Sequence, residues 1–261
     1  MTSRSALVRI VVLVPTGALV LLAAWNLSLL VPHVLEQKYA LGVDLHQYLA
    51  ATRRWLDGQG FYYPHQIAGP YHIVGGDILY PPVVLWLLVP FLVVPEVVWW
   101  LIPLGIVAYA VWRLRPAPWT WPLLAFAVWY PRDEAMVLFG NPGLYVGAAI
   151  AGGVLWAWPA VFAVFKPSLA PFALIGVRHR SWWVALAGFV LLCLPFGGLW
   201  LDFVAAIRNS DGTIWYSVPD LPFMLIPVVA WLGRTRPAPV ETAVPLGLAP
   251  ILSPSLRTAR P

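Results

Sequence analysis

Asp44, Tyr48 and Trp55 share one face of a predicted helix, where together they could bind and activate a hydroxyl group. At about 100° per residue, both aromatic residues fall near the same line along the helix as Asp44. A carboxylate can act as a general base that removes a hydroxyl proton, and aromatic rings can pack against the C–H faces of a sugar. A structural alternative is equally concrete: Asp44 caps its helix, and the aromatic residues anchor it at a membrane interface.

Lys166 is a second candidate, because it lies inside the apolar segment 161–177. A cation at membrane depth is costly and by default marks a transport pathway or an anionic partner. Pro167 and Pro171 also loosen the helix around it. A lipid phosphate would be a natural partner. In the alternative interpretation, the long side chain reaches the membrane surface and keeps its ammonium group hydrated.

Two further polar positions stand directly before apolar segments. Tyr80 precedes Pro81-Pro82, which is an ordinary way to open a helix. Asn141 lies in the helix-breaking sequence Gly140-Asn141-Pro142-Gly143. This second sequence could cradle a polar headgroup or could be a simple loop.

The metal-binding motifs that would point to other chemistry are missing from the sequence. His65 and His72 lie seven residues apart in a glycine-rich loop, which does not match the spacing of common metal ligands. The single cysteine, Cys193, excludes a cysteine-based metal site. No Asp-x-Asp occurs, so the paired carboxylates that often hold a metal on a nucleotide-sugar are absent. We therefore expect no metal and no cofactor, and a lipid-linked donor if the substrate is a sugar.

The composition predicts an integral membrane protein. Of 261 residues, 61% are apolar and 10% are charged, whereas soluble domains have about 45–50% apolar and about 25% charged residues. The basic residues are scattered and form no patch of the kind that nucleic acids require. At about 20 residues per span, the chain has room for about eight. The apolar segments are 10–31, 81–94, 97–112, 118–130, 143–158, 161–177, 182–200 and 221–232.

The expected architecture is an all-α polytopic bundle over residues 1–236, followed by a loosely ordered, proline-rich tail over residues 237–261. The polar segment 32–80 forms the first loop, and within it residues 44–56 predict a helix that lies in the membrane interface. If the spans alternate, nine basic residues lie inside and six outside, which favours cytoplasmic termini. We expect the plasma (inner) membrane as the location. The same alternation places Asn141 on the inner side, away from Asp44.

The order of these motifs resembles the GT-C superfamily of membrane glycosyltransferases, and most closely glycosyltransferase family eighty-seven. The resemblance covers about residues 10–182. Its motifs are a first span, Asp44 followed by Tyr48, WLDGQGFYYP, Tyr80-Pro81-Pro82, Gly140-Asn141, Phe165-Lys166-Pro167 and Arg178-His179-Arg180. Members of that family use polyprenyl-phosphate-mannose as donor, and they are usually longer, with several more spans.

The resemblance implies that Asp44 is the general base of a metal-independent, inverting hexosyltransferase outside the cytoplasm, and that the transferred hexose is mannose. Its partners would be a polyprenyl-phosphate-sugar donor and a lipid or glycan acceptor. In this interpretation Tyr48, Trp55, Tyr80 and Asn141 contact the substrate, and Lys166 or Arg54 stabilises the departing lipid phosphate. The alternative function is a non-catalytic membrane protein that binds or translocates a lipid-linked sugar.

Overall fold

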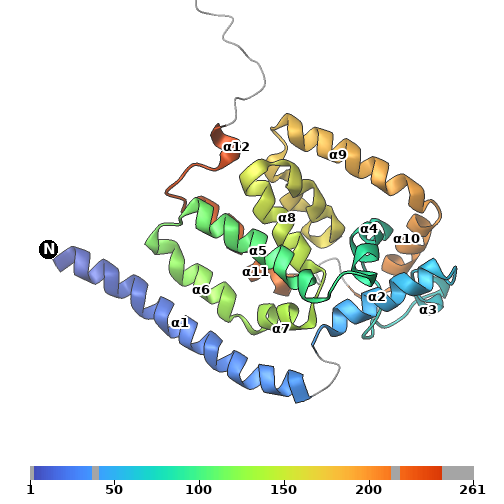
Figure 1. Cartoon of the computed structure of the whole chain (residues 1–261), viewed down its shortest axis with the longest axis horizontal. Helices are drawn as coiled ribbons and strands as arrows, with labels where there is room; N and C mark the ends of the chain where they lie inside the picture. Colours follow the sequence, from blue (N-terminus) through green and yellow to red (C-terminus); the bar gives the residue numbers. More distant parts are fainter. Residues whose placement is uncertain (1–2, 37–40, 213–217, 243–261) are drawn as a thin grey trace, which may run out of the picture.

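The computed structural model describes residues 3–36, 41–212 and 218–242, and over these ranges the protein is helical, with two isolated β-bridges and no strand. The predicted all-α class is therefore confirmed. The long helix α1 lies along one side of the bundle, and α2, α3 and α10 gather at the end farthest from the N-terminus (Figure 1).

Short connections join most of the elements. The α-helices are α1 (Ser3–Glu36), α2 (Val43–Leu56), α3 (Pro64–Ala68), α4 (Leu85–Leu88), α5 (Val97–Leu114), α6 (Trp121–Trp129), α7 (Pro131–Phe139), α8 (Gly143–Trp156), α9 (Arg180–Cys193), α10 (Leu199–Asn209), α11 (Leu221–Leu232) and α12 (Pro239–Thr242). The 3₁₀ helices are η1 (Pro82–Val84), η2 (Val89–Leu92), η3 (Pro118–Thr120), η4 (Trp158–Phe165), η5 (Pro167–Gly176), η6 (Leu194–Phe196) and η7 (Val218–Asp220).

Two described helices are long and apolar enough to cross a membrane, Ile10–Pro32 and Val97–Leu114. The number rises to four if each of two sharply bent pairs is one span: α7 with α8, bent by 107°, and Arg180–Phe196 with α10, bent by 93°. The prediction of eight spans is not confirmed. Several predicted spans carry internal prolines, which remove a helical hydrogen bond and clash with the preceding turn. Segment 161–177 accordingly forms two short 3₁₀ helices, η4 and η5.

Helix α1 has the surface of a lipid-facing helix. Leu13, Leu21 and Trp25 are 53%, 71% and 62% exposed, and only 11% of the span Ile10–Pro32 is buried within the protein. A continuous apolar surface of this size is unfavourable in water, and the helix has the length that a bilayer requires. The exposed apolar face of α1 supports a membrane location.

Helix α8 is buried on almost every side, and its small residues allow close approach. A side-chain carbon at Gly153 would lie 2.6 Å from the Cβ of Ala160 on η4. Such a contact is too short for carbon atoms, so glycine is required there. The run of small residues from Gly147 to Gly153 thus brings neighbouring elements against α8.

Helix α2 confirms the predicted helix over residues 44–56, and Gly58 follows its end with a positive φ of 77°. Its apolar face does not lie free for a membrane interface, however. Leu45 and Leu49 are buried in a core cluster that includes Trp99 of α5. The helix is amphipathic because it packs against the protein.

Simple alternation of the spans gave inconsistent sides for the ends of α5 and α11. The Thr235 hydroxyl donates a 2.6 Å hydrogen bond to the carbonyl of Arg115, so the ends of α5 and α11 lie together, although alternation placed Arg115 outside and Arg234 inside. In the predicted tail over residues 237–261, Ala238 is buried and α12 packs against α8. Residues 243–261 lie outside the described ranges.

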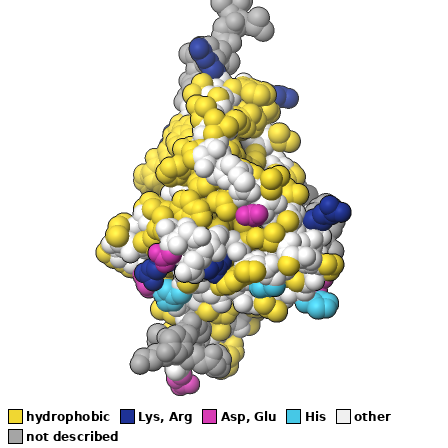
Figure 2. All heavy atoms as spheres, turned by 90° about the vertical axis from the view of Figure 1, so that its right-hand side faces the viewer, with side chains coloured by type: hydrophobic (Ala, Val, Ile, Leu, Met, Phe, Trp, Pro, Cys, Tyr) yellow, Lys and Arg dark blue, Asp and Glu magenta, His cyan; other side chains and the backbone are white. Residues whose placement is uncertain are grey.

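The face that carries α2, α3 and α10 is divided between polar and apolar areas. Figure 2 shows histidine, acidic and several basic side chains over its lower half, whereas hydrophobic side chains dominate the upper half. The candidate site lies among the elements of this polar end.

Candidate functional site

A cavity of about 330 Å³ lies between α2, the segment 75–80, α7 and the start of η5. Five of the predicted site residues line it: Asp44, Tyr48, Tyr80, Asn141 and Lys166. Residues more than 120 positions apart in the sequence thus share one cavity. The lining also includes Gln47, Asp77, Arg132, Met136 and Asp220.

Asp44 and Asn141 are in direct contact. The Nδ2 group of Asn141 donates a 2.6 Å hydrogen bond to Oδ2 of Asp44. Placing Asn141 on the opposite side of the membrane from Asp44 was therefore wrong, because the end of α7 contacts the first loop, where the backbone N–H of Gly42 donates to the carbonyl of Leu138 at 2.9 Å. Asp44 also forms no capping hydrogen bond within its helix, whose N-cap is Gly42.

The orientation of the Asn141 amide is fixed by its neighbours. The backbone N–H of Gly143 donates to Oδ1 at 2.8 Å, and the Tyr80 hydroxyl donates to the same atom at 3.1 Å. Because a backbone N–H can only donate, Oδ1 must point toward Gly143 and the NH₂ group must point toward Asp44. Asn141 is thus a fixed donor to the carboxylate.

Gly140 makes this position of Asn141 possible. It adopts a φ of +67° at the end of α7, a conformation that disfavours side chains. An added Cβ would lie 3.1 Å from Trp100 and 3.2 Å from Leu45. The turn therefore needs glycine for two independent reasons.

Lys166 projects from a break between η4 and η5. Proline disfavours a helical conformation in the residue that precedes it, and Lys166, which precedes Pro167, has extended dihedrals of −120° and 99°. The side chain is 4% exposed. The Lys-Pro sequence thereby places a buried ammonium group at the cavity.

Asp220 joins two cations at this site. The Nζ of Lys166 donates to Oδ2 of Asp220 at 2.6 Å, and Nε of Arg132 donates to Oδ1 at 3.2 Å. The carboxylate neutralises one of the two positive charges, so the group keeps one net positive charge. The Arg132 side chain is 57% exposed and presents the more accessible cation.

Sequence reasoning missed Arg132 and Asp220. The run Arg132-Asp133-Glu134 is a signal that could have identified the first, because three consecutive charged residues interrupt an apolar stretch. Alternation placed Arg132 in an inner loop, and Asp220 carried no motif. Their shared contact with Lys166 is visible only in three dimensions.

The pKa of the Asp44 carboxyl is raised above its ordinary value of 3.8, mainly because burial disfavours the charge. The hydrogen bond from Asn141 and the positive charges of Lys166 and Arg132 act in the opposite direction. A raised pKa makes a carboxylate a better proton acceptor when it is ionised. Asp44 is half-buried and faces the cavity.

Two tyrosines complete the wall between the charged groups. The rings of Tyr48 and Tyr80 pack edge to face with centroids 5.3 Å apart. The Lys166 ammonium group lies 5.9 Å from the centroid of the Tyr80 ring. Tyr80 therefore contacts both the Asn141 side and the Lys166 side of the cavity.

Trp55 and Arg54 do not line the cavity. Trp55 shares an angular position with Asp44 but lies eleven residues along α2, or roughly 16 Å, and packs against Phe196. The Arg54 guanidinium donates to the carbonyls of Gly60 and Phe61 and stacks on Tyr63. Arg54 holds the turn after α2.

The two histidines considered as metal ligands each bond a separate carboxylate. His65 Nε2 lies 2.8 Å from Oδ1 of Asp77, at the cavity edge, and His72 Nδ1 lies 2.6 Å from Oδ2 of Asp211. In the described part of the chain, no group of three histidine, cysteine or acidic side chains is placed to hold a metal ion.

Comparison of the chain with protein-family models, curated proteins and solved structures found no match. Arguments about function therefore rest on the chemistry of this cavity and on the motifs that line it.

Proposed function

We propose that the protein is a membrane glycosyltransferase that moves a hexose from a polyprenyl-phosphate donor to a lipid or glycan acceptor. The observation that carries the proposal is the shared cavity: Asp44 lies on one part of its wall, and the Lys166–Asp220–Arg132 group lies on another. Group transfer from a lipid phosphate needs a base for the acceptor and a cation for the leaving group. Both are present without a metal.

In the proposed reaction, the acceptor hydroxyl attacks the anomeric carbon of the donor. Asp44 takes the hydroxyl proton as the new C–O bond forms. The bond from the anomeric carbon to the phosphate oxygen breaks at the same time, and the polyprenyl phosphate leaves with the electron pair. A single displacement inverts the anomeric configuration.

Arg132 replaces Arg54 as the second phosphate-binding residue in this proposal. Its guanidinium group is partly exposed at the cavity, and Nε is held by Asp220, so its remaining N–H groups can face an anion. The buried Lys166, which is paired with the same carboxylate, adds a second positive charge. Asp220 positions both cations.

The wider context supports the proposal. The exposed apolar helix α1 supports a membrane location, where a polyprenyl donor would reside. The resemblance to family eighty-seven of the GT-C superfamily rests on motifs that include Asp44, Tyr80, Asn141 and Lys166, and these four residues line the cavity. We propose that the cavity opens on the non-cytoplasmic side of the plasma (inner) membrane.

The alternative function is non-catalytic binding or translocation of a lipid-linked sugar. The hydrogen bond from Asn141 to Asp44 favours it, because a donor that stabilises the ionised carboxylate lowers its pKa and makes it a weaker base. In this alternative Asp44 would only hydrogen-bond a sugar hydroxyl.

The deciding experiment compares the wild type with Asp44→Asn, which keeps the shape of the side chain. Purified protein in detergent would receive labelled polyprenyl-phosphate-hexose and a panel of lipid and glycan acceptors. Asp57→Asn is the matched control, because Asp57 is exposed at the opposite end of α2. We expect transfer by the wild type and the control and none by Asp44→Asn, with donor binding intact.

Equal transfer by Asp44→Asn would refute the role of Asp44. Donor binding without transfer by any of the proteins, across several donor sugars, would favour the non-catalytic alternative.

A further inference from the structure

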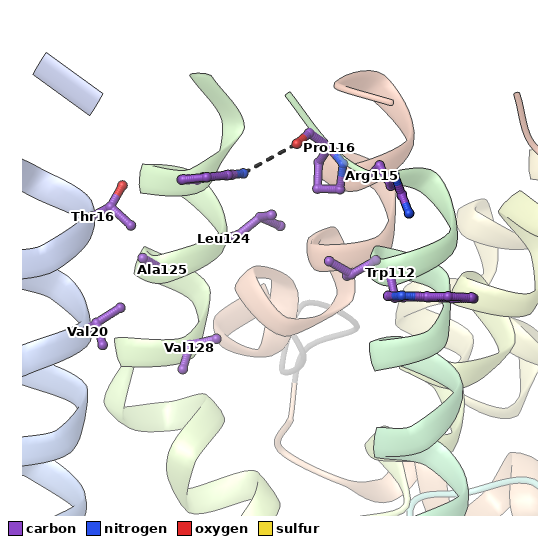
Figure 3. Close-up of a pocket in the computed structure, with 10 residues that line it drawn as sticks. Thr16, Val20, Trp112, Arg115, Pro116, Leu124, Ala125 and Val128 are labelled. Atoms are coloured by element: carbon purple, nitrogen blue, oxygen red, sulfur yellow. Dashed lines mark hydrogen bonds between the residues drawn. The ribbon is translucent and has the colours of Figure 1, made fainter. Parts of the chain in front are cut away.

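A second cavity, of about 630 Å³, lies between α1, α5 and α6 and is named here the α1/α5/α6 groove (Figure 3). Figure 3 shows that α1 and α6 form one side, and that α5 forms the other. Its lining residues are Thr16, Val20, Val111, Trp112, Arg115, Pro116, Trp121, Leu124, Ala125 and Val128. This volume falls within the range of small-molecule sites.

The walls of the groove offer few polar atoms to a ligand. The Thr16 hydroxyl donates a 2.7 Å hydrogen bond to the carbonyl of Val12 in its own helix. The indole N–H of Trp121 donates to the carbonyl of Pro116 at 3.3 Å, as the dashed line in Figure 3 marks. The remaining wall is hydrocarbon, apart from the indole N–H of Trp112 and the charged Arg115.

The groove lies at the other end of α5 from the candidate site. Near the start of α5, Trp99 and Trp100 hydrogen-bond the carbonyls of Gly140 and Val137, beside the first cavity. The groove begins at Val111 and reaches the end of the helix. At 1.5 Å per residue, roughly 20 Å of helix separates the two. An occupant of the groove is therefore distinct from the proposed substrate.

Arg115 places a positive charge at one end of the groove. Arg115 is exposed there, and Figure 3 shows it above Trp112 on the same side of the groove. The bond from Thr235 to the Arg115 carbonyl brings Arg234 and Arg236 to the same end of the bundle. Among the described side chains, no acidic residue forms an ion pair with Arg115.

We propose that the α1/α5/α6 groove binds an acyl chain of an anionic phospholipid, whose phosphate is held by Arg115. The groove adjoins the candidate span Ile10–Pro32, so bilayer lipid has direct access. Its apolar walls match hydrocarbon, and the cation matches a phosphate. Trp112, 62% exposed, lies beside Arg115, where indole rings favour the headgroup region. The proposal is independent of the proposed function.

The test measures lipids retained on the protein by native mass spectrometry after reconstitution with equal amounts of phosphatidylglycerol and phosphatidylcholine. Leu124→Trp fills the groove, and Leu123→Trp adds the same bulk at the neighbouring exposed position, which does not line the groove. We expect Leu124→Trp to lose the retained phosphatidylglycerol, and Leu123→Trp to keep it. Val20→Trp fills the groove from α1 and serves if Leu124→Trp does not fold.

The headgroup contact is tested separately with Arg115→Gln and the matched control Arg113→Gln, since Arg113 does not line the groove. We expect Arg115→Gln to reduce the preference for phosphatidylglycerol about fivefold, and Arg113→Gln to keep it. Equal retention by wild type and both filled variants, or none by wild type, would overturn the proposal. A dimer that disappears in the filled variants would show that a second copy occupies the groove.

Discussion

Asn141 holds the carboxylate of Asp44 through a 2.6 Å hydrogen bond, although 97 residues separate the two in the sequence. The contact joins the first loop to the turn between α7 and α8. Because Gly143 and Tyr80 fix the amide orientation, the donor cannot rotate away without breaking two further hydrogen bonds. The ionised state of Asp44 is therefore stabilised by a fixed group.

The proposed base predicts a pH profile with an acid limb. Because burial raises the pKa of Asp44 above 3.8, the carboxyl is protonated, and cannot accept a proton, at pH values where an exposed aspartate is still ionised. The transfer rate should therefore fall as the pH drops through this raised pKa. The measurement is kcat/KM against pH; a profile without an acid limb would contradict the assignment.

Asn141→Ala should move this acid limb to higher pH. It removes a donor that favours the ionised carboxylate, and hydrogen bonds to charged groups contribute roughly 1.5–3 kcal/mol, equivalent to a displacement of about one pH unit or more. Asn209→Ala is the control, since the Asn209 amide bonds only the carbonyls of Gln66 and Ile67. A loss of rate at every pH, without displacement of the limb, would assign Asn141 a different role.

Asp220→Asn should destabilise the protein by roughly 3 kcal/mol, because it leaves the buried Lys166 without its counter-charge. Adding Lys166→Met should recover much of the loss, since the buried charge is then gone. The melting temperature in detergent reports both effects. Asp211→Asn is the comparison, because it removes an exposed ion pair with His72. It should hardly change the melting temperature. If the two substitutions lower the melting temperature by amounts that simply add, Lys166 and Asp220 are not coupled.

Gly140→Ala should destabilise the protein by more than Gly58→Ala does. Both residues have positive φ, which costs about 1–2 kcal/mol for a residue with a side chain. Only Gly140 also faces close neighbours, Trp100 and Leu45; a Cβ at Gly58 meets nothing within 4 Å. The difference in melting temperature between the two variants measures the effect of Trp100 and Leu45 on a side chain at position 140. Equal losses would show that Trp100 and Leu45 move aside without cost.

Local signals in the sequence predicted α2 well. Apolar spacing over residues 44–56 and Gly58 after it are properties of neighbouring residues, and the helix forms at Val43–Leu56. The break at Lys166 was equally readable, because Pro167 acts on the residue directly before it. Neither result depends on how distant parts of the chain pack.

Packing between distant segments was the part that the sequence did not reveal. Counting apolar segments treats each as a crossing, yet the bend of 107° between α7 and α8 returns the chain to Asp44. Arg132 and Asp220 can be recognised as site residues only once this path of the chain is known. Trp55 was predicted as a site residue from its angular position on the helix alone. That criterion ignores the distance from Asp44 along the helix axis.

The hairpin of η4 and η5, with Lys166 at its turn, has a consequence for biogenesis. The two helices have 8 and 10 residues, and at about 2.0 Å per residue each is shorter than a hydrocarbon core of about 30 Å. Neither could be inserted alone, since its end groups would lack partners in lipid. Helix α8, against which η4 packs at Gly153, is synthesised first. The hairpin is therefore expected to enter the membrane as a pair packed on the earlier helix α8, and not as two independent spans.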